Sequence, residues 1–215
     1  MSDSRDRQFD DLTARARIRD VALARFAEHG VKATRLQDIA RDAGVSVGLV
    51  QHHFGTKDGL RDACDSYVMD VLVRRSADEA AKPEPGGLAD LYDGSGLLAR
   101  YLARALVDGS PAAEMFFRGA VRVTEEFLTG TWPDRFAPGS ARARDAAAVM
   151  SAMHAGTIVL HTYLTRRMGV DVLAREHATA IGAAMADVYA AMGDFVRSDS
   201  GRSITEDITR EHGDD

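Results

Sequence analysis

The stretch AGVSVGLVQHHFGTKDGL, residues 43–60, contains the features that decide how the N-terminal part of the chain folds. Gly44 follows a run with helical periodicity and can adopt a positive φ without the steric cost of a Cβ atom, so it ends one helix. Ser46 is a preferred N-cap residue, and the next helix begins directly after it. Two short helices joined by such a tight turn indicate a helix-turn-helix unit.

The sequence before and after this stretch predicts further helices. Apolar residues at a spacing of four predict a helix over residues 11–29, which Gly30 ends. Thr34 is placed to cap a second helix over residues 35–43, and Thr56 to cap a long fourth helix. The N-terminal part is therefore a three-helix unit whose fourth helix leads into the rest of the chain.

Helical periodicity resumes after a break at KPEPGG, residues 82–87, where prolines and glycines cannot continue a helix. Strand-forming runs of Val, Ile and Thr are almost absent, so we expect an all-α protein. The helices expected beyond the break cover residues 94–108, 111–129, 140–168 and 171–197, with a loop over residues 129–139.

The expected domain organisation follows from this pattern. An N-terminal flexible arm precedes a helix-turn-helix DNA-binding domain of three helices, and a helical ligand-binding and dimerisation domain follows. The last residues are polar and are expected to be a disordered tail. The boundaries of these four parts are residues 1–10, 11–58, 59–197 and 198–215.

The charge of the chain is unevenly distributed. The formal net charge is −6, but residues 1–60 carry ten Lys and Arg against nine Asp and Glu, whereas the remainder carries 17 against 24. A basic face on the N-terminal domain is therefore compatible with the acidic total. The polar N-terminus lacks the apolar core of a signal peptide, and no stretch reaches the roughly 20 apolar residues of a membrane span. We expect a cytoplasmic protein with no membrane partner, in which Cys64, the single cysteine, is a buried apolar residue.

The predicted recognition helix has an outward face that suits the major groove of B-DNA. Val47 offers an apolar contact to a thymine methyl group, Gly48 allows the backbone to approach closely, and Gln51 can pair with adenine or bond to a phosphate. Ser46 and Lys57 each stand at the start of a helix, where free backbone N–H groups can bind a phosphate.

Residues 34–60, TRLQDIARDAGVSVGLVQHHFGTKDGL, resemble the signature of the TetR family of one-component transcriptional regulators. The matching features are the opening threonine, Ile-Ala, Ala-Gly-Val-Ser, an early glycine in the recognition helix, His-Phe, Lys and Leu. Gln51 differs, because the family often has tyrosine there. The resemblance implies a dimeric DNA-binding regulator with an effector site in its C-terminal domain. The DNA contacts expected on both grounds are Thr34, Arg35, Ser46, Val47, Gly48, Gln51, His52, His53 and Lys57.

The adjacent histidines His52 and His53 raise the question of a metal site. Neighbouring residues of a helix point about 100° apart, so a single ion cannot readily bind both. No third ligand lies nearby in the sequence, and we expect neither a metal nor another cofactor. Two simpler roles stay open: Thr34 and Ser46 as helix caps alone, and His53 as a packing residue that touches one phosphate.

Two rows of apolar residues near the C-terminus have alternating spacings of four and three, which are typical of helix-packing seams. Either row could be ordinary core, but two such helices near the C-terminus resemble the four-helix dimer interface of the TetR family, and we expect that role for at least the last helix. The residues expected there are Val149, Met153, Leu160, Ile181, Met185, Val188, Met192 and Phe195.

Methionine and aromatic side chains of the C-terminal part suit the wall of an effector cavity as well as an ordinary core. His154 and His161 are seven residues apart on one expected helix and therefore share a face. They could bind a ligand there, be satisfied buried or interface histidines, or bind a metal. The expected pocket residues are Tyr101, Met115, Phe116, Trp132, Met153, His154 and His161.

These features predict a repressor that binds a palindromic DNA operator as a homodimer and that a small, partly apolar effector releases. One alternative keeps the DNA-binding dimer but places it under the control of a protein partner, or of no ligand. A remote alternative is a helical enzyme that uses His154 and His161. Because the chain has no GxxxxGK[ST], HExxH or GxSxG motif, we expect that it is not an enzyme.

Overall fold

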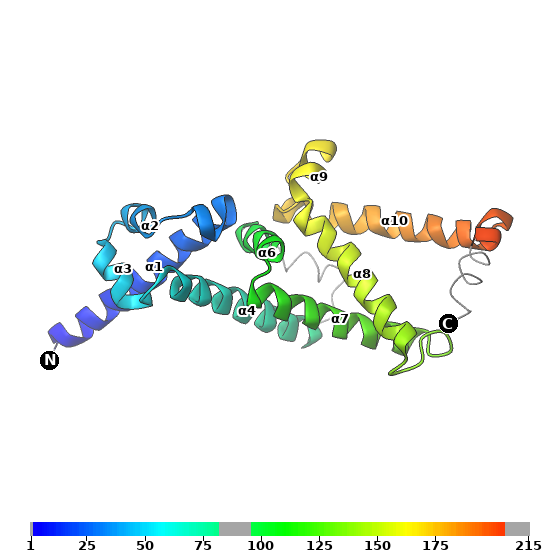
Figure 1. Ribbon diagram of the computed structural model, residues 1–215, viewed down its shortest axis with the longest axis horizontal. Helices are drawn as coiled ribbons and strands as arrows, with labels where there is room; N and C mark the ends of the chain where they lie inside the picture. Colours follow the sequence, from blue (N-terminus) through cyan, green and yellow to red (C-terminus); the bar gives the residue numbers. More distant parts are fainter. Residues whose placement is uncertain (1, 82–95, 205–215) are drawn as a thin grey trace.

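The computed structural model describes residues 2–81 and 96–204, and within them all side chains except those of residues 2–11, 72–81, 175 and 178. Regular structure in this part of the chain is entirely helical, which confirms the expected all-α class (Figure 1). None of the helices described combines the length and hydropathy needed to cross a membrane. The elements are α1 (Ser2–Ala33), α2 (Leu36–Asp42), α3 (Val47–Phe54), α4 (Lys57–Ala81), α6 (Leu97–Asp108), α7 (Pro111–Thr131), α8 (Ala141–Val159), α9 (His161–Met168), the short 3-10 helix η1 (Arg175–His177) and α10 (Ala178–Arg197).

The first helix is longer at both ends than the sequence indicated. It begins at Ser2, so residues 2–10 are helical where a flexible arm was expected. At the other end Gly30 adopts φ 77° and ψ 162°, a conformation outside the helical region that glycine tolerates. The helical path breaks there as predicted, but it resumes for three more residues, to Ala33.

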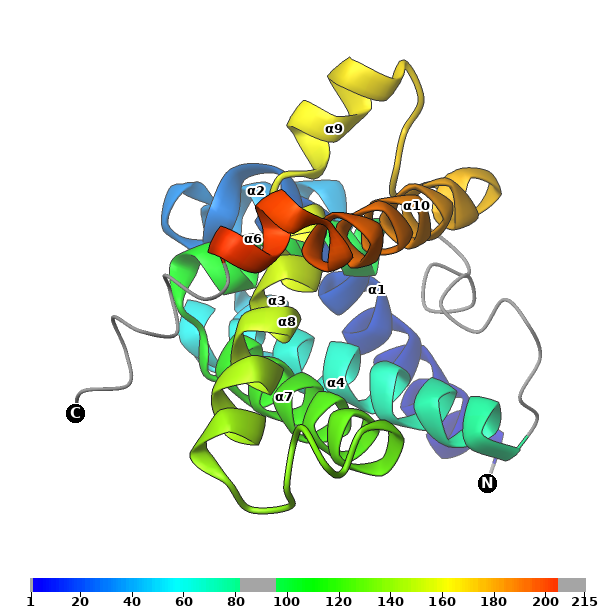
Figure 2. The ribbon, with the colours of Figure 1, turned by 90° about the vertical axis from the view of Figure 1, so that its right-hand side faces the viewer.

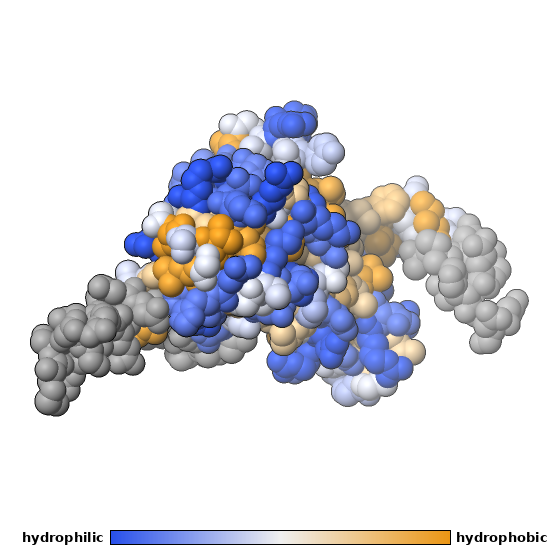
Figure 3. Space-filling model, turned by 60° about the vertical axis from the view of Figure 1, so that its left-hand side comes forward, coloured by the Kyte–Doolittle hydropathy of each residue, from blue (hydrophilic) through white to orange (hydrophobic). Residues whose placement is uncertain are grey.

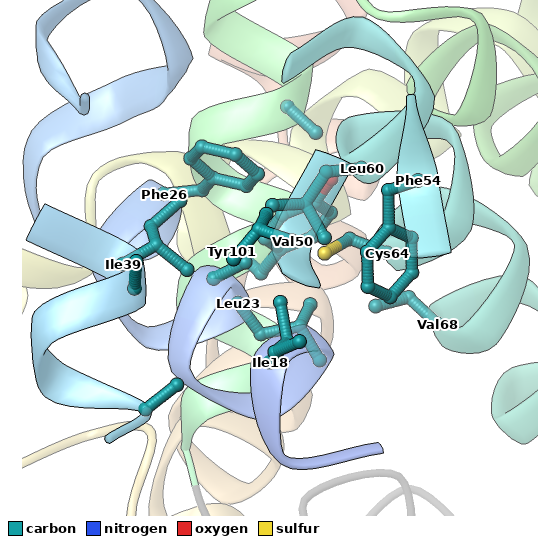
Figure 4. Close-up of a cluster of buried hydrophobic side chains, with 14 of the residues drawn as sticks. Ile18, Leu23, Phe26, Ile39, Val50, Phe54, Leu60, Cys64, Val68 and Tyr101 are labelled. Atoms are coloured by element: carbon teal, nitrogen blue, oxygen red, sulfur yellow. The ribbon is translucent and has the colours of Figure 1, made fainter. Parts of the chain in front are cut away.

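One hydrophobic core joins the first four helices to α6 (Figure 4). Phe26 of α1, Val50 of α3 and Leu60 of α4 are almost completely buried in it, and Tyr101 of α6 packs against the same cluster. Cys64 is also fully buried, and loss of solvation raises the pKa of its thiol to about 12, which confirms its role as a buried apolar residue. The core therefore continues past the boundary expected at residue 58.

Helices α6, α7 and α8 form the next layer, in which α7 and α8 lie against each other along much of their length (Figure 2). Their contact is close because Ala143, Ala147 and Ser151 present small side chains on the buried side of α8. The Ser151 hydroxyl is 3.1 Å from the Thr124 hydroxyl of α7, within hydrogen-bond distance. The loop between these helices falls where the sequence predicted it, and the KPEPGG break lies outside the described residues.

The prediction of a single helix over residues 140–168 is wrong. The helical path is interrupted at Leu160, which separates α8 from α9. Side chains compete with the helical hydrogen bonds at this point. The Thr157 hydroxyl donates to the carbonyl of His154 at 2.7 Å, and the His161 ring lies 2.8 Å from the carbonyl of Ile158.

The helix expected from residue 171 also begins later, at Ala178. Asp171 forms an ion pair with Arg100 of α6, and its other carboxylate oxygen accepts a hydrogen bond from the N–H of Leu173 at 3.1 Å. Val172 and Leu173 are fully buried by this turn, so tertiary packing holds the segment out of a helix. At the C-terminus, residues 199–204 are helical where a disordered tail was expected, and the rest of that tail lies outside the described residues.

Candidate nucleic-acid interface

The recognition helix α3 is positioned as the sequence predicted. Gly44 has φ 65°, which turns the chain after α2. Ser46 has an extended backbone, and its hydroxyl accepts a hydrogen bond from the N–H of Leu49 at 3.1 Å. Because Val50 and Phe54 are buried on one side of α3, the opposite side must face solvent.

The outward side of α3 carries the residues proposed to meet base edges. Gly48, Gln51 and His52 are exposed, and Val47 is half-buried against the core. A Cβ atom at Gly48 would meet nothing in the chain nearer than the Ser46 Oγ, 3.8 Å away. The fold itself therefore does not require glycine at this position.

The two histidines face different environments. The His52 and His53 ring centroids are 5.4 Å apart with an interplanar angle of 64°, and the second ring also meets Phe54 edge-on at 6.0 Å. His52 is exposed, whereas His53 is half-buried against the core. In the described part of the chain no group of three or more His, Cys, Asp and Glu side chains is arranged to hold a metal ion.

Thr34 does not cap α2, and this prediction is wrong. The N-cap residue is Arg35, whose side chain makes no capping hydrogen bond. Thr34 is instead 2% exposed, and its hydroxyl donates to the carbonyl of Gly30 at 2.8 Å, within the end of α1. Because this hydroxyl is directed into the protein, we no longer expect the Thr34 side chain to contact DNA. Arg35 is exposed, and we still expect it to do so.

Lys57 is also held inside the protein. Its ammonium group donates to the carbonyls of Val31 at 2.8 Å and Thr34 at 3.1 Å, with Lys32 at a longer 3.4 Å. These carbonyls lie at the end of α1, where the helix leaves its acceptors unsatisfied. The expected grip on a phosphate is thus replaced by a clamp between α4 and α1, which no local pattern could reveal because the partners are more than 20 residues apart.

Several other cations of this region are already paired. Arg25 of α1 forms an ion pair with Asp42 of α2, and the hydrogen bond from this guanidinium lowers the pKa of the Asp42 carboxyl. Arg41 contacts both Asp38 and Asp42. Arg15 is different: it is exposed, and its guanidinium carbon lies 5.3 Å from the centre of the Phe54 ring at the end of α3. The sequence reasoning did not include this cation.

The compact three-helix unit with a capped, outward-facing α3 has a counterpart among known families. Residues 18–64 match the family model described as bacterial regulatory proteins, tetR family. Residues 18–64 therefore form a TetR-type helix-turn-helix domain. The TetR-type domain begins at Ile18, in the middle of α1, and ends at Cys64, inside α4.

Individual relatives extend the similarity beyond the TetR-type domain. The chain is 38% identical over 122 residues to the HTH-type transcriptional regulatory protein RaaS of Mycobacterium tuberculosis, which is 55% of this chain and 57% of that protein. It is 40% identical over 100 residues to the HTH-type transcriptional repressor Rv3405c of the same organism, 46% and 50% of the two chains. A third match is the HTH-type transcriptional regulator BetI of Burkholderia ambifaria, 40% identical over 73 residues, 33% and 38%. The chain thus spans about half the length of the first two of these curated relatives and 38% of the third.

Beyond the TetR-type domain, most of the residues expected at a dimer interface are exposed in the single chain. Val149 is 61% exposed on α8, and Val188 is 56% exposed on α10. Ile181 and Met185 are half-buried, and the other members of the set are exposed: Met153, Leu160, Met192 and Phe195. Figure 1 shows α10 running across α8 and on beyond it.

The residues expected to line one effector pocket are not brought together. Tyr101 is buried in the core, whereas Met115 and Trp132 are exposed on the surface and the latter meets Phe127 edge-on. His154 lies within hydrogen-bond distance of the Tyr189 hydroxyl of α10, at 2.8 Å, and burial lowers the pKa of its ring. His161 is on α9, so the two histidines do not share one helix face as predicted. Of the two remaining residues expected in this pocket, Phe116 is half-buried and Met153 is exposed.

A pocket of about 270 Å³ lies elsewhere, where the end of α1, the start of α4 and the turn from α6 to α7 meet. We call it the junction pocket. Tyr101 lines it, and the other six residues expected in the effector pocket do not. Its remaining walls come from both expected domains, from residues 26–58 on one side and from residues 61 and 104–111 on the other, because only the fold brings these segments together.

Proposed function

We propose that this protein is a DNA-binding transcriptional regulator, a repressor that binds a palindromic operator as a dimer and that a small, partly apolar effector releases. The observation that carries the proposal is the outward face of α3 in a TetR-type domain. Glycine stands there although the fold has room for a side chain, at Gly48. Regulators and a repressor among the relatives support the same function.

In this proposal α3 enters the major groove, and its exposed residues meet base edges. Gln51 supplies an amide that can both donate to and accept from adenine, and Gly48 lets the helix backbone approach the groove. Arg15 and Arg35, which are exposed, would contact phosphates beside α3. Ser46 keeps its hydroxyl for the cap at Leu49, so the free N–H groups of the first turn would bind phosphate there.

Dimerisation follows from the small size of one recognition helix, because two half-sites roughly double the number of base contacts. The exposed apolar rows of α8 and α10 are the surface proposed for it. Val149, Val188 and Met192 are each more than half exposed in one chain. Large apolar side chains grouped in this way are typical of surfaces that a second copy covers.

The test is selection of genomic or random duplexes with the purified full-length chain, followed by mobility shift at several salt concentrations. We expect a palindromic site whose affinity falls steeply with salt. Gln51→Ala is expected to change the base preference at one position in each half-site, whereas Val123→Ala on the exposed side of α7 is not. Recovery of no preferred duplex by the folded protein would contradict the proposal.

A further inference from the structure

We propose that the junction pocket binds a small organic anion with a single apolar ring, and that this ligand is the effector that sets the DNA affinity. The inference rests on the proposed function for its regulatory half and on the pocket alone for its binding half. The pocket is defined by its position between the end of α1, the start of α4 and the turn from α6 to α7.

The floor of the junction pocket is apolar. Phe26, Tyr101 and Ala105 line it and are buried in the core that joins the TetR-type domain to α6. A volume of about 270 Å³ exceeds the ~150 Å³ cavity that accommodates benzene in a protein interior. A single ring with one polar substituent therefore fits the space.

The rim of the junction pocket is cationic. Four cationic side chains line it against two carboxylates, those of Asp58 and Asp108. Arg61 contacts Asp58 at 3.2 Å, and Arg104 contacts Asp108 at 3.1 Å, so both carboxylates are already engaged. The other two cations are Lys57, clamped to the end of α1, and Lys32, which is exposed at the rim. The surplus positive charge favours an anionic ligand, because an anion can approach these groups over a desolvated apolar floor.

The walls of the junction pocket belong to parts that must move relative to each other if the recognition helices are to change their spacing. Lys32 and Lys57 lie on the TetR-type domain, whereas Arg104 lies on α6. The Arg104 guanidinium also lies across the break in α1: a Cβ atom at Gly30 would be 2.6 Å from its Nη2. A ligand that binds Arg104 therefore acts on the joint between α1 and α6.

Regulation follows from this position by linkage. A ligand that fits the pocket in one arrangement of α1, α4 and α6 shifts the protein toward that arrangement. If that arrangement differs from the one bound to DNA, the ligand weakens DNA binding, and DNA weakens ligand binding by the same factor. Helix α4 leads from the TetR-type domain into the rest of the chain, and Lys57, Asp58 and Arg61 at its start all line the pocket.

The experiment uses benzoate as the probe, with the full-length protein, followed by calorimetric titration and by mobility shift on the selected duplex. We expect saturable benzoate binding, weaker binding of the neutral benzamide, and none of benzylammonium. Arg104→Gln should weaken benzoate binding about tenfold or more, because a charged hydrogen bond is lost. Arg122→Gln is the matched control, since Arg122 also contacts a carboxylate four residues later at 3.1 Å, that of Glu126 on α7.

Lys32→Gln is the second variant, because this exposed side chain can be changed without disturbing the core. Absence of benzoate binding, or binding that neither Arg104→Gln nor Lys32→Gln weakens, would overturn the assignment of the pocket. Benzoate binding that leaves the DNA affinity unchanged would overturn the regulatory half. Failure to bind any duplex would instead overturn the proposed function, and the titration would still decide whether the pocket takes the anion.

Discussion

Thr34 and Lys57 meet at the end of α1, where backbone carbonyls need partners. The Thr34 hydroxyl donates to the carbonyl of Gly30 at 2.8 Å, and the Lys57 ammonium donates to those of Val31 and Thr34. Both residue types are common in DNA-contacting positions, yet here their donors are used inside the protein. Some polar side chains of this domain therefore satisfy carbonyls at the end of α1, whereas others lie on the outward side of α3.

Lys57→Met should lower the free energy of unfolding by about 1–3 kcal/mol, because it leaves half-buried carbonyls without their charged donor. Urea denaturation measures this loss, and Lys32→Met at the exposed rim of the junction pocket is the control. The salt dependence of DNA binding should stay the same. A slope reduced by about one with unchanged stability would show that Lys57 binds a phosphate after all.

Gly48→Ala should separate folding from DNA recognition. Helical glycines cost up to about 1 kcal/mol relative to alanine, and the added Cβ has room, so the variant should be as stable as the parent or more stable. Its affinity for the selected duplex should fall about tenfold, because the Cβ separates α3 from the base edges. Gly119→Ala on α7, where a Cβ would meet nothing within 4 Å, should raise stability without this loss. Equal DNA affinities of the two variants would refute close approach at Gly48.

Between elements, a buried polar pair joins α4 to α6. The Tyr101 hydroxyl donates to the Asp65 carboxylate at 2.7 Å, and Asp65 is only 6% exposed. Burial raises the pKa of Asp65 above its ordinary value of 3.8, and this effect outweighs the hydrogen bond, which lowers it. The ionised form of Asp65 therefore destabilises the contact between α4 and α6, which borders the junction pocket.

Asp65→Asn should keep the acceptor for Tyr101 while removing the charge. A carboxyl whose pKa is raised in the folded protein contributes stability below its unfolded pKa, near 3.8, and that contribution is lost as the pH rises through the folded pKa. The variant should therefore be more stable than the parent at pH 7, and the difference should shrink as the solution is acidified toward pH ~4. Urea denaturation across this range measures it. A pH-independent difference between Asp65→Asn and the parent would contradict the assignment.

Across the whole molecule, the core is concentrated in the TetR-type domain and α6, whereas α8 and α10 keep large apolar side chains on the surface. Figure 3 shows one face on which hydrophilic side chains cover most of the surface and apolar ones gather in separate patches. The Tyr189 hydroxyl and the His154 ring, which lie 2.8 Å apart, connect α10 to α8. This arrangement suits a surface shared by two copies.

Val188→Glu should convert a dimer into a monomer, because it places a charge in the centre of the proposed α10 surface, where it would lose its hydration. Light scattering after size-exclusion chromatography measures the mass, and the same sample should lose binding to a two-half-site duplex. Val123→Glu on α7, where the parent valine is 57% exposed, is the control and should leave the mass unchanged. A monomeric parent, or a dimeric Val188→Glu protein, would rule out this interface.

The local sequence determined the elements of the TetR-type domain, because their signals act within one or two helical turns. Gly44 turns the chain and Ser46 caps α3, both as predicted, and Val50 and Phe54 form its buried side. Composition and periodicity were likewise enough for the all-α class. In the C-terminal part the same reasoning found the helices, but not where packing interrupts them.

Tertiary structure alone decided the remaining features, because their partners are distant in the chain. Lys57 is drawn to carbonyls more than 20 residues away, and Asp171 to Arg100, which holds residues near α10 out of a helix. The junction pocket exists only where α1, α4, α6 and α7 meet, so the spacing of residues in the sequence could not predict it. Short-range backbone preferences thus specified α3. Long-range contacts specified the junction between α1, α4 and α6, which we propose controls DNA binding.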